Sequence, residues 1–81
     1  MVAFMLFEIS ATNGEVEGLG RHEMTILPRT GDFIEIESSY LEVIAVTLAD
    51  CDDPTGAADV HARRVGDFSA HLRAIRHRAG S

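Results

Sequence analysis

The sequence predicts an α+β fold that is mainly β, namely a small, strongly bent antiparallel sheet or barrel of four to five strands with a C-terminal helix at about residues 67–79. Short runs of β-branched and aromatic residues alternate with turn signals about every ten residues, a pattern typical of small sheets and barrels. Only in the last segment, at about residues 67–79, do the apolar residues recur with the spacing of a helix. With 81 residues, of which 46% are hydrophobic, the chain has the size and composition of one folded domain, 1–81.

The first third of the chain predicts two strands joined by a hairpin turn. Residues 2–9 are apolar at nearly every position, which indicates a strand covered on both faces. Asn13-Gly14 is the strongest two-residue hairpin signal, because both central residues of that turn need a positive φ. Residues 15–17 begin the returning strand, Gly18-Leu19-Gly20 indicates a bulge or bend, and residues 22–27 resume extended structure.

The middle of the chain predicts a second pair of strands. A turn is expected at residues 27–32, with Pro28 at its first central position and Gly31 at its close. Residues 33–37 alternate as in a half-buried strand, and Ser38-Ser39 forms a short connection. Residues 40–49 are rich in β-branched side chains and predict the central strand of the sheet.

After a loop at residues 50–56, the last quarter of the chain allows more than one interpretation. Residues 60–65 predict a last strand. Gly66-Asp67 is then either a tight turn into a further strand or the start of a helix capped by Asp67. The helix is favoured, and a single helix over residues 57–79 is a minor third option. Three kinds of signal support the favoured helix. An apolar face at i, i+4 and i+7 is formed by Phe68, Leu72 and Ile75. The last turn holds the cations Arg76, His77 and Arg78, and Gly80 follows as the stop.

One stretch resembles a known family. Residues 27–36, Leu-Pro-Arg-Thr-Gly-Asp-Phe-Ile-Glu-Ile, place a proline shortly before a Gly-Asp pair and an alternating strand, and residues 40–46, Tyr-Leu-Glu-Val-Ile-Ala-Val, follow a short turn. This pattern resembles the small Src-homology-3-like β-barrels of bacteria and phages over residues 27–49. The resemblance implies a barrel fold. It implies no catalytic residues, since that fold hosts RNA-binding, peptide-binding and scaffold functions.

Charge is distributed unevenly along the chain. Residues 1–59 carry twelve acids and two arginines and sum to −10, whereas residues 60–81 carry one acid and five arginines and sum to +4, for a net charge of −6. An acidic body repels nucleic acid and anionic membranes. We therefore expect the basic tail and the acidic body to neutralise each other within the fold, with a local contact between the tail and a partner as the alternative.

The aspartate, cysteine and histidine residues lack the spacing that a metal site or a catalytic site needs. The aspartates of the loop at residues 50–53 do not follow the calcium-loop pattern, and their charge would raise the pKa of the neighbouring Cys51 thiol. A single cysteine excludes an internal disulfide. The four histidines lack zinc-site spacing, and ordinary roles suffice for two of them: an ion pair with Asp67 for His71 and a helix-dipole contact for His77. We therefore expect no metal, no cofactor and no enzymatic activity.

With enzymes and metal proteins not expected, the predicted function is that of an interaction domain. The longest apolar run, residues 1–7, is too short to span a membrane and lacks the basic flank of a signal peptide, so a cytoplasmic location is expected. The chain is predicted to bind a protein partner or itself, with Arg63, Arg64, Arg73 and Arg76 as polar contacts. The alternative is nucleic-acid binding by the basic C-terminal face. Against it, the five aromatic residues fit core positions, with Tyr40 as the expected exception, whereas nucleic-acid modules expose aromatics for stacking.

Overall fold

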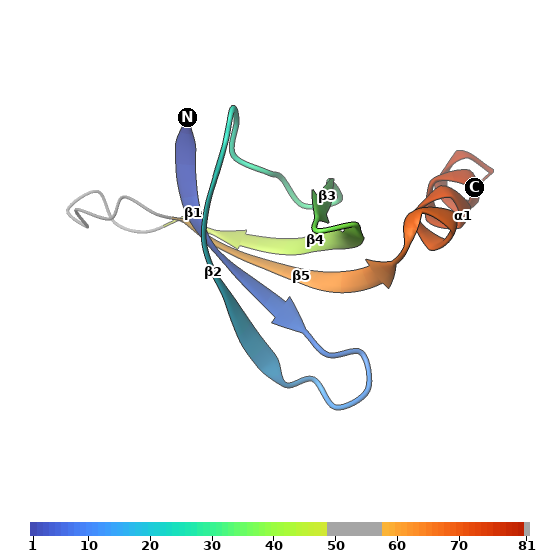
Figure 1. Ribbon diagram of the computed structural model, residues 1–81, viewed down its shortest axis with the longest axis horizontal. Helices are drawn as coiled ribbons and strands as arrows, with labels where there is room; N and C mark the ends of the chain where they lie inside the picture. The colour runs from blue at the N-terminus through green and yellow to red at the C-terminus, as the bar shows by residue number, and fades with distance from the viewer. Residues whose placement is uncertain (49–57, 81) are drawn as a thin grey trace.

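The computed structural model describes residues 1–48 and 58–80 and contains one sheet and one helix (Figure 1). The loop aspartates, Cys51 and residue 49 lie outside this described part. Within it, the fold is mainly β with a C-terminal helix, as predicted. The elements in chain order are β1 (Val2–Ile9), β2 (Val16–Met24), β3 (Phe33–Ile36), β4 (Ser39–Thr47), β5 (Ala58–Gly66) and α1 (Phe68–Ala79).

The strands form one sheet in the order β2-β1-β5-β4-β3. Three neighbouring pairs are antiparallel, and β1 pairs with β5 in parallel. The expectation that residues 40–49 form the central strand is wrong, because β5 takes that place between the two hairpins. Its small residues Ala58 and Ala62 are both buried in the core.

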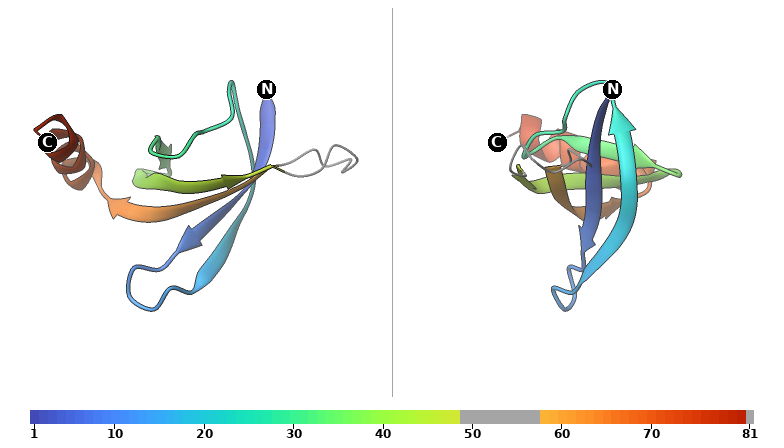
Figure 2. Two further views of the ribbon diagram at one scale, coloured as in Figure 1. Left: turned by 180° about the vertical axis from the view of Figure 1, so that it is seen from behind. Right: turned by 90° about the vertical axis from the view of Figure 1, so that its left-hand side faces the viewer.

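The sheet is curled into a half-barrel, with β2 and β3 as its two edges (Figures 1 and 2). The predicted bulge in β2 is present, since the register with β1 shifts where Leu6 and Phe7 meet the two glycines. The concave face holds the core, whose largest fully buried side chains come from β1, β4 and β5: Phe4, Leu6, Leu41, Val43 and Val60. Only this face of β1 is buried, because Met5 and Phe7 on the other face stay half-buried.

The turns differ in detail from their predictions. The β1–β2 connection is a longer loop in which Ser10 N–H donates to the Glu15 carbonyl, and only Gly14, with φ of 72°, is left-handed. The middle turn lies at residues 29–32, with Gly31 at φ of 96°. Glu37 and Ser38, rather than Ser38 and Ser39, join β3 to β4, and both have positive φ, as a tight two-residue hairpin requires.

The helix begins and ends close to the predicted residues. The Asp67 carboxylate accepts a hydrogen bond from Ala70 N–H at 3.0 Å, and Gly80 N–H donates to the Arg76 carbonyl. The alternatives of a further strand and of one helix over residues 57–79 are therefore wrong. The helix lies beyond the end of β5 and contacts β4 and β5 (Figure 1). None of its residues is fully buried, and Phe68, which was expected in the core, is 57% exposed.

Candidate functional site

Aromatic rings attach the helix to the sheet, and Phe68 is one of them, since its ring centroid lies 6.0 Å from that of Tyr40 on β4. The ring of His71 stacks on Tyr40, with 4.2 Å between the ring centroids, and meets the edge of Phe33 at 4.8 Å. The ion pair predicted between His71 and Asp67 is not among the interactions of the described residues. The His71 ring therefore packs between α1 and the β3–β4 hairpin.

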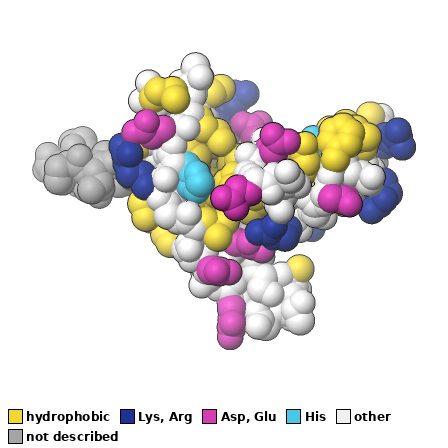
Figure 3. Space-filling model, in the orientation of Figure 1, with side chains coloured by type: hydrophobic (Ala, Val, Ile, Leu, Met, Phe, Trp, Pro, Cys, Tyr) yellow, Lys and Arg dark blue, Asp and Glu magenta, His cyan; other side chains and the backbone are white. Residues whose placement is uncertain are grey.

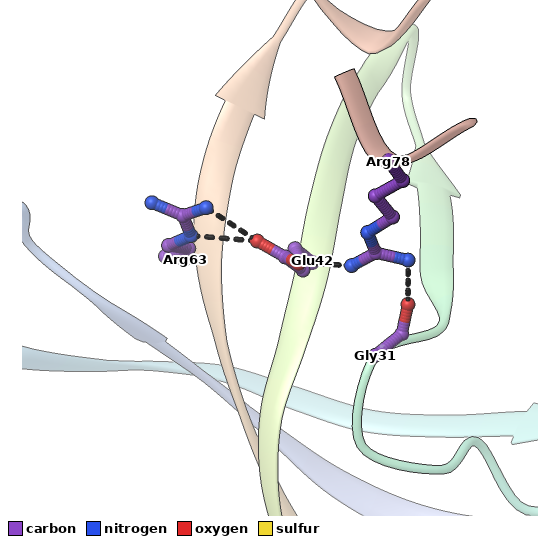
Figure 4. A network of polar contacts seen from close by, with 4 residues as sticks. All are labelled: Gly31, Glu42, Arg63 and Arg78. Carbon is purple, nitrogen blue, oxygen red and sulfur yellow. Dashed lines mark hydrogen bonds and ion pairs between the residues drawn. The ribbon is translucent and has the colours of Figure 1, made fainter. Parts of the chain in front are cut away.

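A carboxylate on β4 completes the attachment of the helix (Figure 4). Glu42 accepts hydrogen bonds from Arg63 on β5, 2.7 Å from Nε, and from Arg78 at the end of α1. Arg78 also donates to the Gly31 carbonyl and lies over the Phe33 ring. Partial burial of Glu42 raises the pKa of its carboxyl, but the hydrogen bonds from the two guanidinium groups outweigh it and lower that pKa. Arg78, which the sequence analysis names only as a cation of the last helical turn, therefore reaches across to β4 with its guanidinium.

A second ion pair closes one end of the concave face. Arg64 on β5 forms two parallel hydrogen bonds with Glu8 on β1, at 2.8 and 3.1 Å. The hydrogen bond from Arg64 lowers the pKa of the Glu8 carboxyl, and the same contact raises the pKa of Arg64. Glu8 and Arg64 follow the buried positions of their strands at a spacing of two residues, so their pairing lets charged groups end the core without being left unpartnered.

The four arginines predicted as polar contacts therefore fall into two groups. Arg63 and Arg64 are engaged by carboxylates of the same chain, so part of the basic tail neutralises part of the acidic body. Arg73 and Arg76 lie exposed on α1, and within the described residues no ion pair or hydrogen bond holds their side chains.

Next to Arg76 on the helix runs the apolar stripe that the i, i+4, i+7 spacing predicts. Phe68 is 57% exposed and Ile75 is 40% exposed, with the half-buried Leu72 between them. His71 and Arg78 occupy the sheet side of the helix, and the stripe lies beside them. Phe68 contacts the ring of Tyr40 and still leaves more than half of its side chain exposed. Figure 3 shows apolar side chains beside arginine side chains over the helix. The i, i+4, i+7 spacing was visible in the sequence, but it does not say whether an apolar face meets the sheet.

Clefts on the described part of the sheet include one on the face between its edges, one beside β3 and one at the β1–β2 hairpin. One of about 220 Å³ lies between the two edges and is lined by residues such as Leu19, Ile36 and Leu41. A more apolar one of about 380 Å³ is lined by residues including Met24 and Phe33, and a polar one of about 310 Å³ lies at the β1–β2 hairpin.

No group of three or more metal-ligating side chains comes together in residues 1–48 and 58–80. Two further histidines have aromatic partners: His22 stacks on Phe4, and His61 stacks on Phe7.

A scan against protein-family models and searches of curated proteins and of solved structures found no match to this chain. The resemblance of residues 27–49 to Src-homology-3-like barrels therefore stays a prediction. Among the residues that the structure describes, the only helix is far too short to reach across a lipid bilayer.

Proposed function

We propose that the chain is a small non-enzymatic interaction domain that binds a protein partner or a second copy of itself through helix α1. The observation that supports this most directly is the exposed apolar stripe of Phe68 and Ile75 next to Arg73 and Arg76. Exposed aromatic and aliphatic anchors beside arginine are the composition that protein interfaces favour.

The ion pairs favour Arg73 and Arg76 over the other two predicted contacts. A partner that recruits Arg63 or Arg64 must compete with Glu42 or Glu8, which already accept charge-assisted hydrogen bonds from them. Arg73 and Arg76 can meet a partner's carboxylate without breaking a contact in this chain.

The alternative, nucleic-acid binding by the basic C-terminal face, has weaker support. Phe68 is a single exposed aromatic on the basic helix, and the body of the chain carries a strong negative charge. A phosphate backbone would be repelled by that body.

Site-specific photocrosslinking in the cells that make the protein tests the proposal. The variant Phe68→p-benzoylphenylalanine places the reactive group on the stripe, and Ile26→p-benzoylphenylalanine places it at another exposed apolar position as the matched control. We expect one defined polypeptide product from position 68, unchanged by nuclease and missing from position 26. A product that nuclease removes would support the alternative, and no product at position 68 would contradict both.

A further inference from the structure

The free side of α1 combines an apolar stripe with positive charge. On a helical wheel, Phe68, Leu72 and Ile75 lie within about 60° of one another, and Arg76 and then Arg73 follow on the side away from the sheet. A matching partner therefore offers an exposed apolar side chain flanked by carboxylates.

The same chain carries a surface of that description at the start of β2. Val16 is 55% exposed and stands between Glu15 and Glu17, beside the polar cleft of about 310 Å³. Glu15 forms no ion pair within the part of the chain that the structure describes, and Glu17 exerts only a longer-range attraction on Arg64.

The free side of α1 and the Glu15–Glu17 segment lie too far apart to contact each other within one molecule. The β1–β2 hairpin extends from one side of the sheet, whereas α1 lies beyond the far end of β5, and both views show them apart (Figures 1 and 2). Figure 3 shows acidic side chains on the hairpin at the bottom and basic ones on the helix at the right. The unpaired charges of the helix and the hairpin are thus separated within one chain.

We propose that helix α1 of one copy docks on the Glu15–Glu17 segment of a second copy, and that the reciprocal contact closes a twofold dimer. This rests on the proposed function and names its partner as the chain itself. A twofold arrangement uses both surfaces of both copies, so it leaves no complementary surface open for further growth. The net charge of −6 on each copy opposes approach in other orientations, because most other faces repel.

Charge reversal of each surface tests the dimer. The helix variant Arg73→Glu/Arg76→Glu and the hairpin variant Glu15→Arg/Glu17→Arg each bring like charges together in the homodimer. We expect each variant alone to raise the dimer dissociation constant at least about 100-fold in sedimentation equilibrium at moderate salt. Mixed in equal amounts, the two variants present opposite charges at both contacts and should form a heterodimer.

Arg21→Glu/Arg29→Glu is the matched control, because it changes the net charge as much as the helix variant while leaving α1 intact. It should dimerise like the unmodified chain, and circular dichroism checks that all variants fold.

Three results would overturn the proposal: an unmodified chain that sediments as a monomer up to millimolar concentration, a dimer that the two reversals leave intact, or two monomeric variants that stay monomeric when mixed. Each is separable from failure of the proposed function. A photocrosslink from position 68 to another polypeptide would keep the interaction role and assign it to a different partner.

Discussion

Replacing Glu42 by glutamine tests whether this carboxylate attaches the helix to the sheet. Glu42 has a side-chain exposure of 19% and accepts from the guanidinium groups of Arg63 and Arg78. Exposed ion pairs contribute about 0.2–1 kcal/mol each. Because the Glu42 carboxylate is largely shielded from solvent and has two partners, we place each pair near the upper end of that range even though the arginines are about half exposed, and the variant should lose about 1–2 kcal/mol of unfolding free energy at pH 7.

The loss should depend on pH in a defined direction. The Glu42 pKa is lowered in the folded protein from an ordinary value of 4.5, so its contribution to stability is complete above that value. The contribution disappears as the pH falls through the lower, folded pKa. The unmodified chain and Glu42→Gln should therefore differ at pH 7 and converge in strong acid.

Urea unfolding followed by circular dichroism at a series of pH values measures this difference. Glu23→Gln is the matched control, since Glu23 pairs with Arg21 but both side chains are about half exposed, and its loss should stay below about 0.5 kcal/mol. Equal losses for the two variants, or a Glu42→Gln loss that persists unchanged at low pH, would refute the role assigned to the carboxylate.

Three further changes have expected outcomes in the same unfolding assay. Leu41→Ala, at a side chain 1% exposed, should cost about 2–5 kcal/mol, whereas Leu48→Ala, 72% exposed, should be nearly neutral. Glu37→Asn with Ser38→Gly should add about 0.5–1 kcal/mol, because both positions have positive φ and the pair Asn-Gly suits that turn. Asp67→Ala removes the N-cap and should cost about 1 kcal/mol, with α1 amides exchanging faster with solvent.

Each of these outcomes has a clear contrary result. Similar losses at the two leucines would contradict the assigned core. A destabilised Asn-Gly variant would mean that the hairpin turn is not of the expected type. Unchanged exchange in α1 after Asp67→Ala would mean that contacts with the sheet, and not the cap, limit opening of the helix.

Local signals in the sequence predicted most of the elements. Residues 2–9 match β1, the paired glycines match the bulge in β2, and Asp67 caps the helix. These features depend on interactions between residues a few positions apart, which a sequence displays directly. Asn13-Gly14 was misleading, because a turn signal does not set loop length. Here the loop is closed by Ser10, whose N–H donates to the Glu15 carbonyl and whose carbonyl accepts from Gly14 N–H.

Contacts between distant segments decided the candidate site. Glu8 and Arg64 are 56 positions apart, and Arg78 and Gly31 are 47 apart. Their pairing depends on the sheet order and on the parallel β1–β5 ladder, neither of which local propensity encodes. The uneven charge was visible from the start, but which arginines it neutralises was not.

The sequence by itself determined the fold class, the position of the helix, and the separation of an acidic body from a basic tail. Only the tertiary structure decided that His71 and Arg78 face the sheet and that Phe68 and Ile75, beside them, remain partly exposed. The physical reason is that helical spacing defines an apolar face but not its direction. The direction follows from the aromatic and ionic contacts that a folded sheet offers to the helix.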